Sequence, residues 1–433
     1  MSLASPQFNL ADQTNLFKIN YYKKSENMYN SENALQGRVK KRYDFVGKQK
    51  FVATPLSFSG GVGSGVLPKS NAGRYEGAVI IAKRVYATCE VEREAIKASA
   101  NDSGAFVRAT KETVQKTVES YMRNVSRILF GDGSAVLGRG DGIAIVTGAG
   151  SMASPYKIII SEESWKEANF EEKDYVQYVS GMPAWPLNFG GTAEGGQSDT
   201  NLLEIVSVYP EAREIELVGT STALQALVAG GAVMPATDGL CLQKSYEQDP
   251  IGLKTIFDAA VNGIAGADLV YNIPTQRRWM AKLEDAQEMG LSTDLINKLM
   301  LQIKKQFGKS PNMLMVGFEQ YRNMLALLED QKVYNLPNRN LKGHMGFEGV
   351  EYVGAGGVKI GIFLDRFADK DKVYAINDNF IECHHRPGFG WFDDDGTVFL
   401  RLQNEDAYGA RYGGYYQNFI TPTPHGFLHN LAV

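Results

Sequence analysis

The stretch EREAIKASANDSGAFVRATKETVQKTVESYMRNVSRILFGDGS, residues 92–134, contains the strongest helix signal in the chain. Asn101, Asp102 and Ser103 are favourable N-cap residues, because their short side chains accept hydrogen bonds from the free N–H groups of a first helical turn. Gly131 ends the pattern. The spacing predicts a helix of about 27 residues, roughly 40 Å long. Its apolar positions recur at spacings of three, four or seven and are Val107, Val114, Val118, Tyr121, Val125 and Ile128.

Two strand-like segments precede this helix. YDFVGKQKFVATPLSF, residues 43–58, and AVIIAKRVYATCEVE, residues 78–92, are rich in β-branched and aromatic residues. The connection between them is several times longer than a hairpin turn requires. We therefore predict a two-stranded arm with a glycine-rich tip that includes Gly60, Gly61, Gly63, Gly65 and Lys69.

The N-terminal residues 1–42 are polar and rich in Asn, and they show no sustained periodicity, which predicts an extended arm whose partners lie on another surface. Between Lys18 and Lys50 nine Lys and Arg residues stand against three acidic residues. Such a segment is either a solvated basic arm or one that contacts phosphate groups.

Residues 142–249 are β-like, with short strand candidates between Gly, Pro and acidic turns. LEIVSVYPEAREIELVG, residues 203–219, predicts a hairpin with its turn at Pro210–Arg213. We predict a small β barrel or sandwich inserted after the long helix.

The last third of the chain predicts an α+β arrangement. STDLINKLMLQIKKQFG, residues 292–308, is an amphipathic helix capped by Ser292 or Thr293 and ended by Gly308. A short buried strand and a second helix follow. Strand pairs are then expected within VEYVGAGGVKIGIFLD, KVYAINDNFIECHH and GWFDDDGTVFLRL, residues 350–365, 372–385 and 390–402.

Composition limits the classes of protein to consider. With 433 residues, 44% of them hydrophobic and 22% charged, the chain is foldable and large enough for two or three packed units. No window has ~18 uninterrupted apolar residues, so no membrane-spanning helix is expected. Cys89, Cys241 and Cys383 lie too far apart for a paired metal motif, and a disulfide framework is not expected. The net charge of −4 argues against attraction of nucleic acid by the whole molecule.

Short motifs offer little chemistry. FGKSP, residues 307–311, reads as a helix stop because it follows a helix, whereas a phosphate loop follows a strand. CHH, residues 383–385, places neighbouring side chains on opposite faces of a strand. FDDDG, residues 392–396, is typical of a hairpin turn, and RGD, residues 139–141, lies in a glycine-rich loop. We predict no catalytic residue, no cofactor-binding residue, no bound metal and no enzymatic activity.

The order of these segments resembles that of the major capsid proteins of tailed phages. The specific part is residues 92–134, where a strand runs into IKAS, then GAF, one long helix, and LFGDG at its exit. The resemblance implies the α+β Hong Kong 97-like (Johnson) fold. The implied parts are an N-terminal arm (1–42), an extended two-stranded loop (43–100), the spine helix and start of the peripheral domain (101–150), a β-rich inserted segment (151–250), the axial domain (251–375), and C-terminal strands returning to the peripheral domain (376–433).

The resemblance also implies a function. Such a chain self-assembles through pentamers and hexamers into an icosahedral shell, in the virion, around the double-stranded DNA genome of a tailed phage. Lys40, Lys41 and Arg42 would then face the DNA. Separate scaffolding, portal and decoration proteins are further expected partners, assembly is expected in the host cytoplasm, and no cleavage of this chain is expected.

Two alternatives stay open at this point. The β-rich middle and the aromatic C-terminal tail also suit a tail-tube or baseplate protein of a phage. An enzyme with an α+β body is the other alternative, because catalytic groups need not be close in sequence. Asp393 and Asp395 would be its first candidates.

Overall fold

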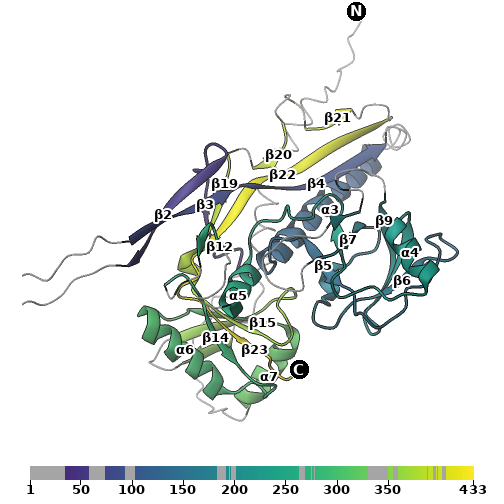
Figure 1. Ribbon diagram of the computed structural model, residues 1–433. Helices are drawn as coiled ribbons and strands as arrows, with labels where there is room; N and C mark the ends of the chain where they lie inside the picture. Colours follow the sequence, from purple (N-terminus) through teal and green to yellow (C-terminus); the bar gives the residue numbers. More distant parts are fainter. Residues whose placement is uncertain are drawn as a thin grey trace, which may run out of the picture.

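The computed structural model describes most of the chain after the N-terminal arm. The described residues are 35–57, 74–92, 103–182, 192–194, 196, 201–262, 269–274, 276, 278–329, 350–354, 359–387, 389–393, 396, 398–401 and 406–433. The loop-tip residues Gly60, Gly61, Gly63, Gly65 and Lys69 lie outside them. Figure 1 shows a long sheet lying along one helix, a β-rich insertion on one side, and an α/β unit that contains the C-terminus.

The predicted long helix is present as α3, Ser103–Leu129. Its apolar stripe packs against the long sheet, mainly against β4 (Lys83–Glu92) and β22 (Ala407–Ile420). Of the predicted stripe, five residues are at most 3% exposed: Val114, Val118, Tyr121, Val125 and Ile128. The side chain of Val107 lies outside the described residues.

The sheet behind α3 is organised around β22, which pairs with β4 along ten residue pairs. On its other side β22 pairs with β19 (Ile381–His385), and β1 (Lys40–Arg42) runs parallel to β19. The strands β20 (Gly390–Trp391) and β21 (Leu400–Arg401) each pair with β22. The predicted pairing of these two with each other is therefore wrong, because the long β22 offers both of them a partner.

The two-stranded arm is present, but its second strand is shorter than predicted because the chain leaves the arm at Ala82. β2 (Gln49–Ser57) pairs with β3 (Arg74–Ile81) as an antiparallel hairpin. The predicted second strand, residues 78–92, breaks at Ala82, and its remainder becomes β4 of the long sheet. Only residues 78–81 of that segment therefore belong to the arm, although the apolar pattern continues through residue 92.

The β-rich segment forms a small closed barrel, which also takes in β5 ahead of the predicted start at residue 151. Its strands follow the order β5-β11-β7-β9-β10-β6, with β8 beside β7. An antiparallel bridge between Gly140 and Ile160 joins the two ends of this order. A Cβ atom on Gly140 would lie 2.4 Å from the carbonyl oxygen of Met234, so only glycine fits at the closure. The bounds are β5 Val136–Arg139, β6 Tyr156–Ile159, β7 Tyr175–Ser180, β8 Thr192–Ala193, β9 Leu203–Tyr209, β10 Glu214–Gly219, β11 Gly239–Leu242, the short helix η1 Glu167–Asn169 and α4 Thr222–Gly230.

The barrel has its own hydrophobic core, which includes Tyr156, Ile158, Leu203 and Ile215. The hairpin predicted at residues 203–219 is β9–β10, closed by a hydrogen bond from Arg213 N to Pro210 O. The helix α4 was not predicted.

The α/β unit is a mixed sheet in the order β14-β23-β18-β15-β17-β16. The helix predicted at residues 292–308 is α6, and Ser292 caps it by accepting from Leu295 N. The bounds are α5 Leu253–Asn262, β12 Leu269–Val270, β13 Ile273–Pro274, β14 Lys282–Asp285, α6 Thr293–Phe307, β15 Met313–Val316, α7 Phe318–Glu329, β16 Val350–Val353, β17 Lys359–Leu364, β18 Val373–Ile376, the short helix η2 Asp378–Phe380 and β23 Gly426–His429.

Two expectations about the C-terminal part need correction. The strands within residues 372–385 do not pair with each other, because β18 belongs to the α/β sheet and β19 to the long sheet. The segment 376–433 does not return entirely to the long sheet either. Its last strand, β23, pairs with β14 and β18 of the α/β sheet.

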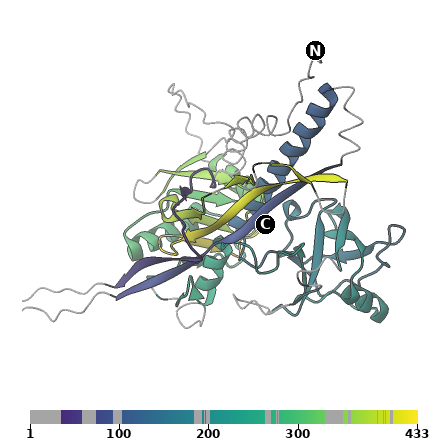
Figure 2. The ribbon, with the colours of Figure 1, turned by 90° about the horizontal axis from the view of Figure 1, so that it is seen from above.

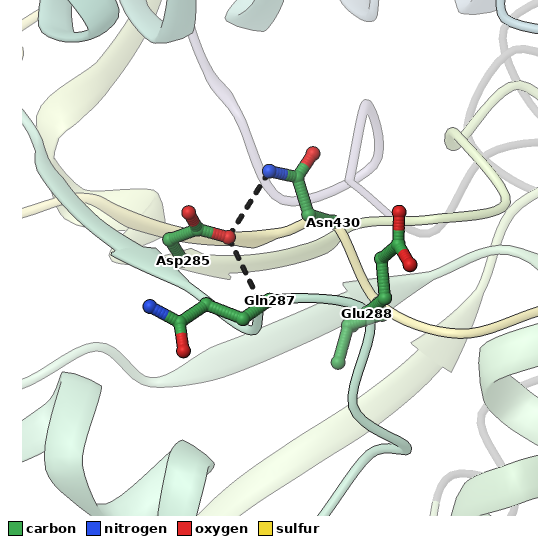
Figure 3. A pocket seen from close by; sticks show the side chains of 5 residues that line it. Asp285, Gln287, Glu288 and Asn430 are labelled. Carbon is green, nitrogen blue, oxygen red and sulfur yellow. Dashed lines mark hydrogen bonds between the residues drawn. The ribbon is translucent and has the colours of Figure 1, made fainter.

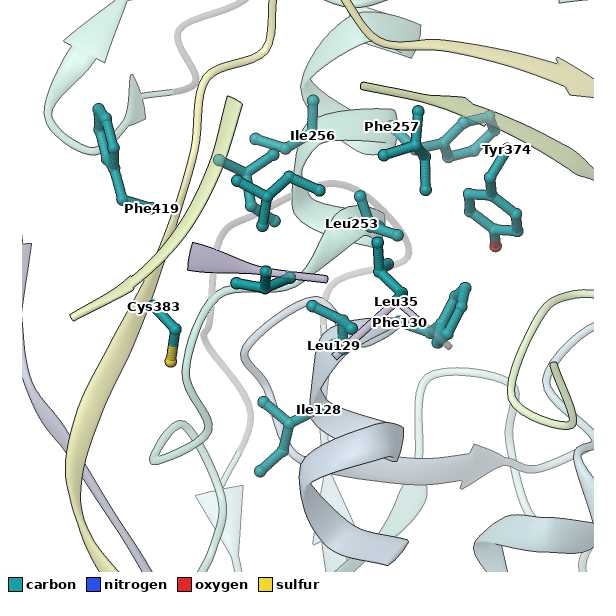
Figure 4. Packing of buried hydrophobic residues seen from close by; sticks show 14 of the residues in the cluster. Leu35, Ile128, Leu129, Phe130, Leu253, Ile256, Phe257, Tyr374, Cys383 and Phe419 are labelled. Carbon is teal, nitrogen blue, oxygen red and sulfur yellow. The ribbon is translucent and has the colours of Figure 1, made fainter. Parts of the chain in front are cut away.

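The described end of the N-terminal arm docks on its own chain. Leu35, Val39 and Phe45 are buried in the main hydrophobic core. Figure 4 shows Leu35 among Leu129, Phe130 and Leu253. For residues 35–42 the expectation of partners on another surface is therefore wrong, because apolar side chains at these positions fill the core beside α3. Within the described residues, no helix combines the length and apolarity that crossing a membrane requires.

Candidate functional site

The β2–β3 hairpin presents two unlike faces. Successive side chains of a strand point to opposite sides, and Leu56, Ala78 and Ile80 are at most 3% exposed on the side toward the core. On the opposite side Phe51 is 68% and Tyr75 61% exposed. We call this side the outer hairpin face, and its residues are Gln49, Phe51, Ala53, Pro55, Tyr75, Gly77, Val79 and Ile81.

Apart from Gln49 at its base, the outer hairpin face is apolar across both strands. The register places Phe51 opposite Val79 and Pro55 opposite Tyr75. A Cβ atom on Gly77 would lie 3.7 Å from the Phe51 ring, so that ring lies close to the glycine backbone. Exposed apolar groups gathered on one strand face are typical of an interaction surface rather than of a solvated edge.

The base of the hairpin is anchored to the rest of the chain. Val79 N donates to Tyr271 O at 2.9 Å, which ties β3 to the turn between β12 and β13. Lys50 Nζ lies 2.7 Å from Asp44 Oδ2, and the Arg386 guanidinium donates to Gly47 O. Beyond these contacts β2 and β3 project away from the body in both views (Figures 1 and 2).

The spine helix is held against the long sheet by aromatic side chains. Tyr121 packs edge-on against Tyr412 and Phe389, with ring centroids 5.2 and 5.8 Å apart. Burial raises the pKa of Tyr121 well above its ordinary value, so its hydroxyl stays protonated. Such edge-to-face pairs contribute about 0.5–1.5 kcal/mol each beyond their buried area. The long sheet that contains β4 is thereby fixed on α3.

Charged groups fix the exit of α3. Arg127 NH1 lies 2.8 Å from Asp249 Oδ2, and both side chains are 9% exposed. Asp132 lies 3.2 Å from Lys254 of α5 and accepts from Ser134 N at 2.9 Å. Burial alone would raise the pKa of Asp132, but Lys254 and Ser134 outweigh it and lower that pKa to about 2. At Asp249 burial outweighs the attraction of Arg127 and raises the pKa. The entrance and the exit of the barrel therefore meet at two ion pairs, of which the Asp132–Lys254 pair favours ionisation of its carboxylate.

A second ionic site joins the barrel to the α/β unit. Lys166 Nζ lies 2.5 Å from Asp369 Oδ1 and donates to Phe367 O at 2.7 Å. Lys372 Nζ lies 2.7 Å from the other oxygen of Asp369. Burial opposes ionisation of Asp369, but the two lysines prevail and lower its pKa strongly. Sequence reasoning missed these residues, since no local pattern signals a contact across some two hundred positions.

The predicted DNA-facing residues lie in β1. Arg42 makes a two-pronged ion pair with Glu382 at 2.7 Å, so its charge is already compensated within the chain. Lys40 is exposed and its Nζ donates to Asn379 O at 3.4 Å. Lys41 is partly buried.

The remaining candidates for chemistry are structural. Cys383 Sγ lies 3.2 Å from His385 Nε2, and both side chains are buried. Burial raises the pKa of Cys383 and lowers that of His385 to about 3, so neither group is ionised at neutral pH. Among the described residues no group of three or more His, Cys, Asp or Glu side chains could hold a metal ion. Asp393 O accepts from Gly396 N, which forms the turn expected there, and Asp395 lies outside the described residues.

A depression of about 460 Å³ lies at the ends of β14 and β23 (Figure 3). Gln287, Glu288 and Asn430 adopt left-handed backbone conformations there. Asp285 Oδ1 accepts from Gln287 N at 2.9 Å and from Asn430 Nδ2 at 3.0 Å. The carboxylate is therefore occupied in shaping the turn. The fifth lining residue is Leu431.

Comparison with known proteins gives the class. The model of the SU10 major capsid protein family matches residues 226–385. The fold is similar to that in the capsid asymmetric unit of cyanophage A-1(L), with a TM-score of 0.50 and 10% identity, over 93% of this chain and 94% of that one. The procapsid of satellite phage P4, which includes the size determination protein, has a TM-score of 0.40 and 7% identity over 97% and 98% of the chains. An encapsulin of Synechococcus elongatus has a TM-score of 0.41 and 8% identity, over 91% of this chain and 85% of that one. No curated protein matches the chain.

The fold is thus that of phage capsid proteins, mixed α and β as predicted. The family match over residues 226–385 and this fold together support a capsid-forming structural protein. The tail-tube, baseplate and enzyme alternatives are set aside, because both findings indicate a structural capsid protein.

Proposed function

We propose that the chain assembles through hexamers and pentamers into an icosahedral shell around the double-stranded DNA genome of a tailed phage. The observation that carries the proposal is the outer hairpin face, an apolar strand surface that projects from the body of a capsid fold. Burying one large apolar side chain is worth about 1.5–3 kcal/mol. A neighbouring copy that covers Phe51, Tyr75 and Ile81 would gain that stabilisation at every contact in the shell.

The geometry suits repeated head-to-tail contacts. One face of the hairpin is used within the chain, and the other is left for a different surface of the next copy. Contacts between unlike surfaces close into rings when the rotation between copies allows it. The glycines expected at the tip, Gly60, Gly61, Gly63 and Gly65, with Lys69 beside them, would allow the tip to follow different angles in pentamers and hexamers.

The inner surface of such a shell faces packed DNA. Lys40 is the best candidate among the predicted basic residues for a contact with phosphate, because Arg42 is already paired with Glu382. A net charge of −4 keeps the overall attraction weak, so the genome could still leave the shell. Assembly in the host cytoplasm with separate scaffolding, portal and decoration proteins completes the proposal.

Charge substitution on the outer hairpin face tests the role of this surface. Phe51→Asp combined with Tyr75→Asp places two carboxylates where a neighbour would pack, and neither change touches the buried face. We expect sedimentation velocity to show folded monomers or small oligomers in place of shells. Tyr209→Asp is the matched control, because Tyr209 is 46% exposed on the barrel. Shells formed equally well by the double variant would refute the role of this face.

A further inference from the structure

The His384 imidazole is buried where β19, the β1–β2 connection and β2 meet. Its side chain is 2% exposed. Nδ1 lies 3.3 Å from Lys50 Nζ and 3.5 Å from Asp44 Oδ1. Nε2 lies 3.4 Å from Glu382 Oε2. Each ring nitrogen therefore faces a carboxylate, and one of them also faces an ammonium group.

The contact with Lys50 identifies the protonation state of the ring. An ammonium group has only donors, so it attracts Nδ1 only when that nitrogen carries a lone pair. The ring is then neutral, with its proton on Nε2, which faces Glu382 but has no hydrogen-bond partner among the described residues. Burial, and next the charge of Lys50, lower the pKa of His384, while Glu382 and Asp44 act in the opposite direction. Arg42, which pairs with His384 in the strand register, is engaged with Glu382.

Protonation would reverse these contacts. A proton on Nδ1 would leave two cationic donors 3.3 Å apart, so Lys50 would be repelled. The two carboxylates would be attracted at the same time, since both lie within 3.5 Å of a ring nitrogen. Asp44 now binds Lys50 at 2.7 Å. On protonation of the ring, the Asp44 carboxylate would turn from Lys50 to the imidazolium, and the Lys50 ammonium group would move out to solvent.

This exchange acts at the base of the hairpin. Asp44 lies between β1 and β2, and Lys50 is the second residue of β2, directly before Phe51 of the outer hairpin face. We infer that His384 is a protonation switch, in which uptake of a proton transfers Asp44 from Lys50 to the ring and loosens the first residues of β2. The inference goes beyond the proposed function, because it concerns the folded chain whether or not shells form.

Hydrogen exchange on the full chain tests the inference. Exchange of peptides from residues 49–57 is followed from pH 7.5 to 4.5 and corrected for the intrinsic pH dependence of amide exchange. A peptide from α6, residues 293–307, serves as the internal reference. We expect protection of the β2 peptide to fall several-fold more than that of the reference on acidification. In His384→Gln, which cannot take up the proton, this excess should vanish.

Lys50→Met provides a second, independent variant that keeps the ring and the length of the Lys50 stem. It removes the repulsion, so the His384 pKa measured by NMR should rise and the pH dependence of the β2 peptide should disappear. Equal pH dependence in wild type and His384→Gln would overturn the inference. An unchanged His384 pKa in Lys50→Met would overturn it as well, including where His384→Gln fails to fold.

Discussion

Asp258 of α5 should make the folded chain less stable as the pH rises. Its side chain is 2% exposed, and its Oδ1 atom has no hydrogen-bond partner among the described residues. Burial raises the pKa of Asp258 to about 8, with Lys254 opposing and Asp132 assisting the rise. The carboxyl group is therefore protonated in the folded chain at neutral pH, whereas in an unfolded chain it ionises near pH ~3.9.

The sign and size of the effect follow from proton binding. Between about pH 4 and pH 8 the folded state holds a proton that the unfolded state has lost, so this group reduces the free energy of unfolding as pH rises. The slope is about 1.4 kcal/mol per pH unit. Asp258→Asn imitates the protonated acid and cannot ionise. Its stability relative to wild type should therefore increase by several kcal/mol between pH 5 and pH 8.

Urea unfolding followed by tryptophan fluorescence at pH 5, 6.5 and 8 measures this difference. Asp285→Asn is the control, because the backbone N–H of Gln287 and the Asn430 amide lower the pKa of Asp285. This carboxyl group is therefore ionised in both the folded and the unfolded chain between pH 5 and pH 8, and it contributes no slope there. Parallel stability profiles for wild type and Asp258→Asn would refute the assignment of a buried, protonated carboxyl group.

Three further outcomes are expected. Ile128→Ala, at a 1% exposed position of the spine helix, should lower the free energy of unfolding by about 2–5 kcal/mol, whereas Val261→Ala at a 56% exposed position should change it little. Gly140→Ala should lower the melting temperature measured by circular dichroism, because the new methyl group would lie 2.4 Å from Met234 O at the barrel closure. Burial lowers the pKa of His425 to about 3, so the folded chain should lose stability below about pH 6.5, where only the unfolded state takes up this proton. His425→Gln should flatten that loss in urea titrations, and an unchanged acid slope would contradict it.

Local signals make several elements predictable from the sequence. The sequence before α3 contains residue types that favour a cap, and the helix has an apolar stripe of regular spacing, so both signals lie within thirty residues. The cap of α6 at Ser292 and the turn between β9 and β10 also depend only on residues that are close in sequence. The order of these elements along the chain is enough by itself to indicate the capsid class.

Contacts between distant segments could not be predicted in this way. The apolar pattern continues through Ala82, so nothing local shows that β3 joins a hairpin while β4 joins β22. The sequence of β23 is that of an ordinary short strand. Only its pairing with β14 and β18 shows that it belongs to the α/β sheet. The pairing of Lys166 with Asp369 likewise depends on the packing of the barrel against the loop before β18.

Electron microscopy of the purified chain, with light scattering on the same sample, tests the central claim most directly. We predict closed shells, or hexamers and pentamers, in which a neighbouring copy covers Phe51 and Tyr75 of the outer hairpin face. A monomer or dimer that neither crowding, salt nor a scaffolding protein drives into assemblies would contradict the proposed assembly.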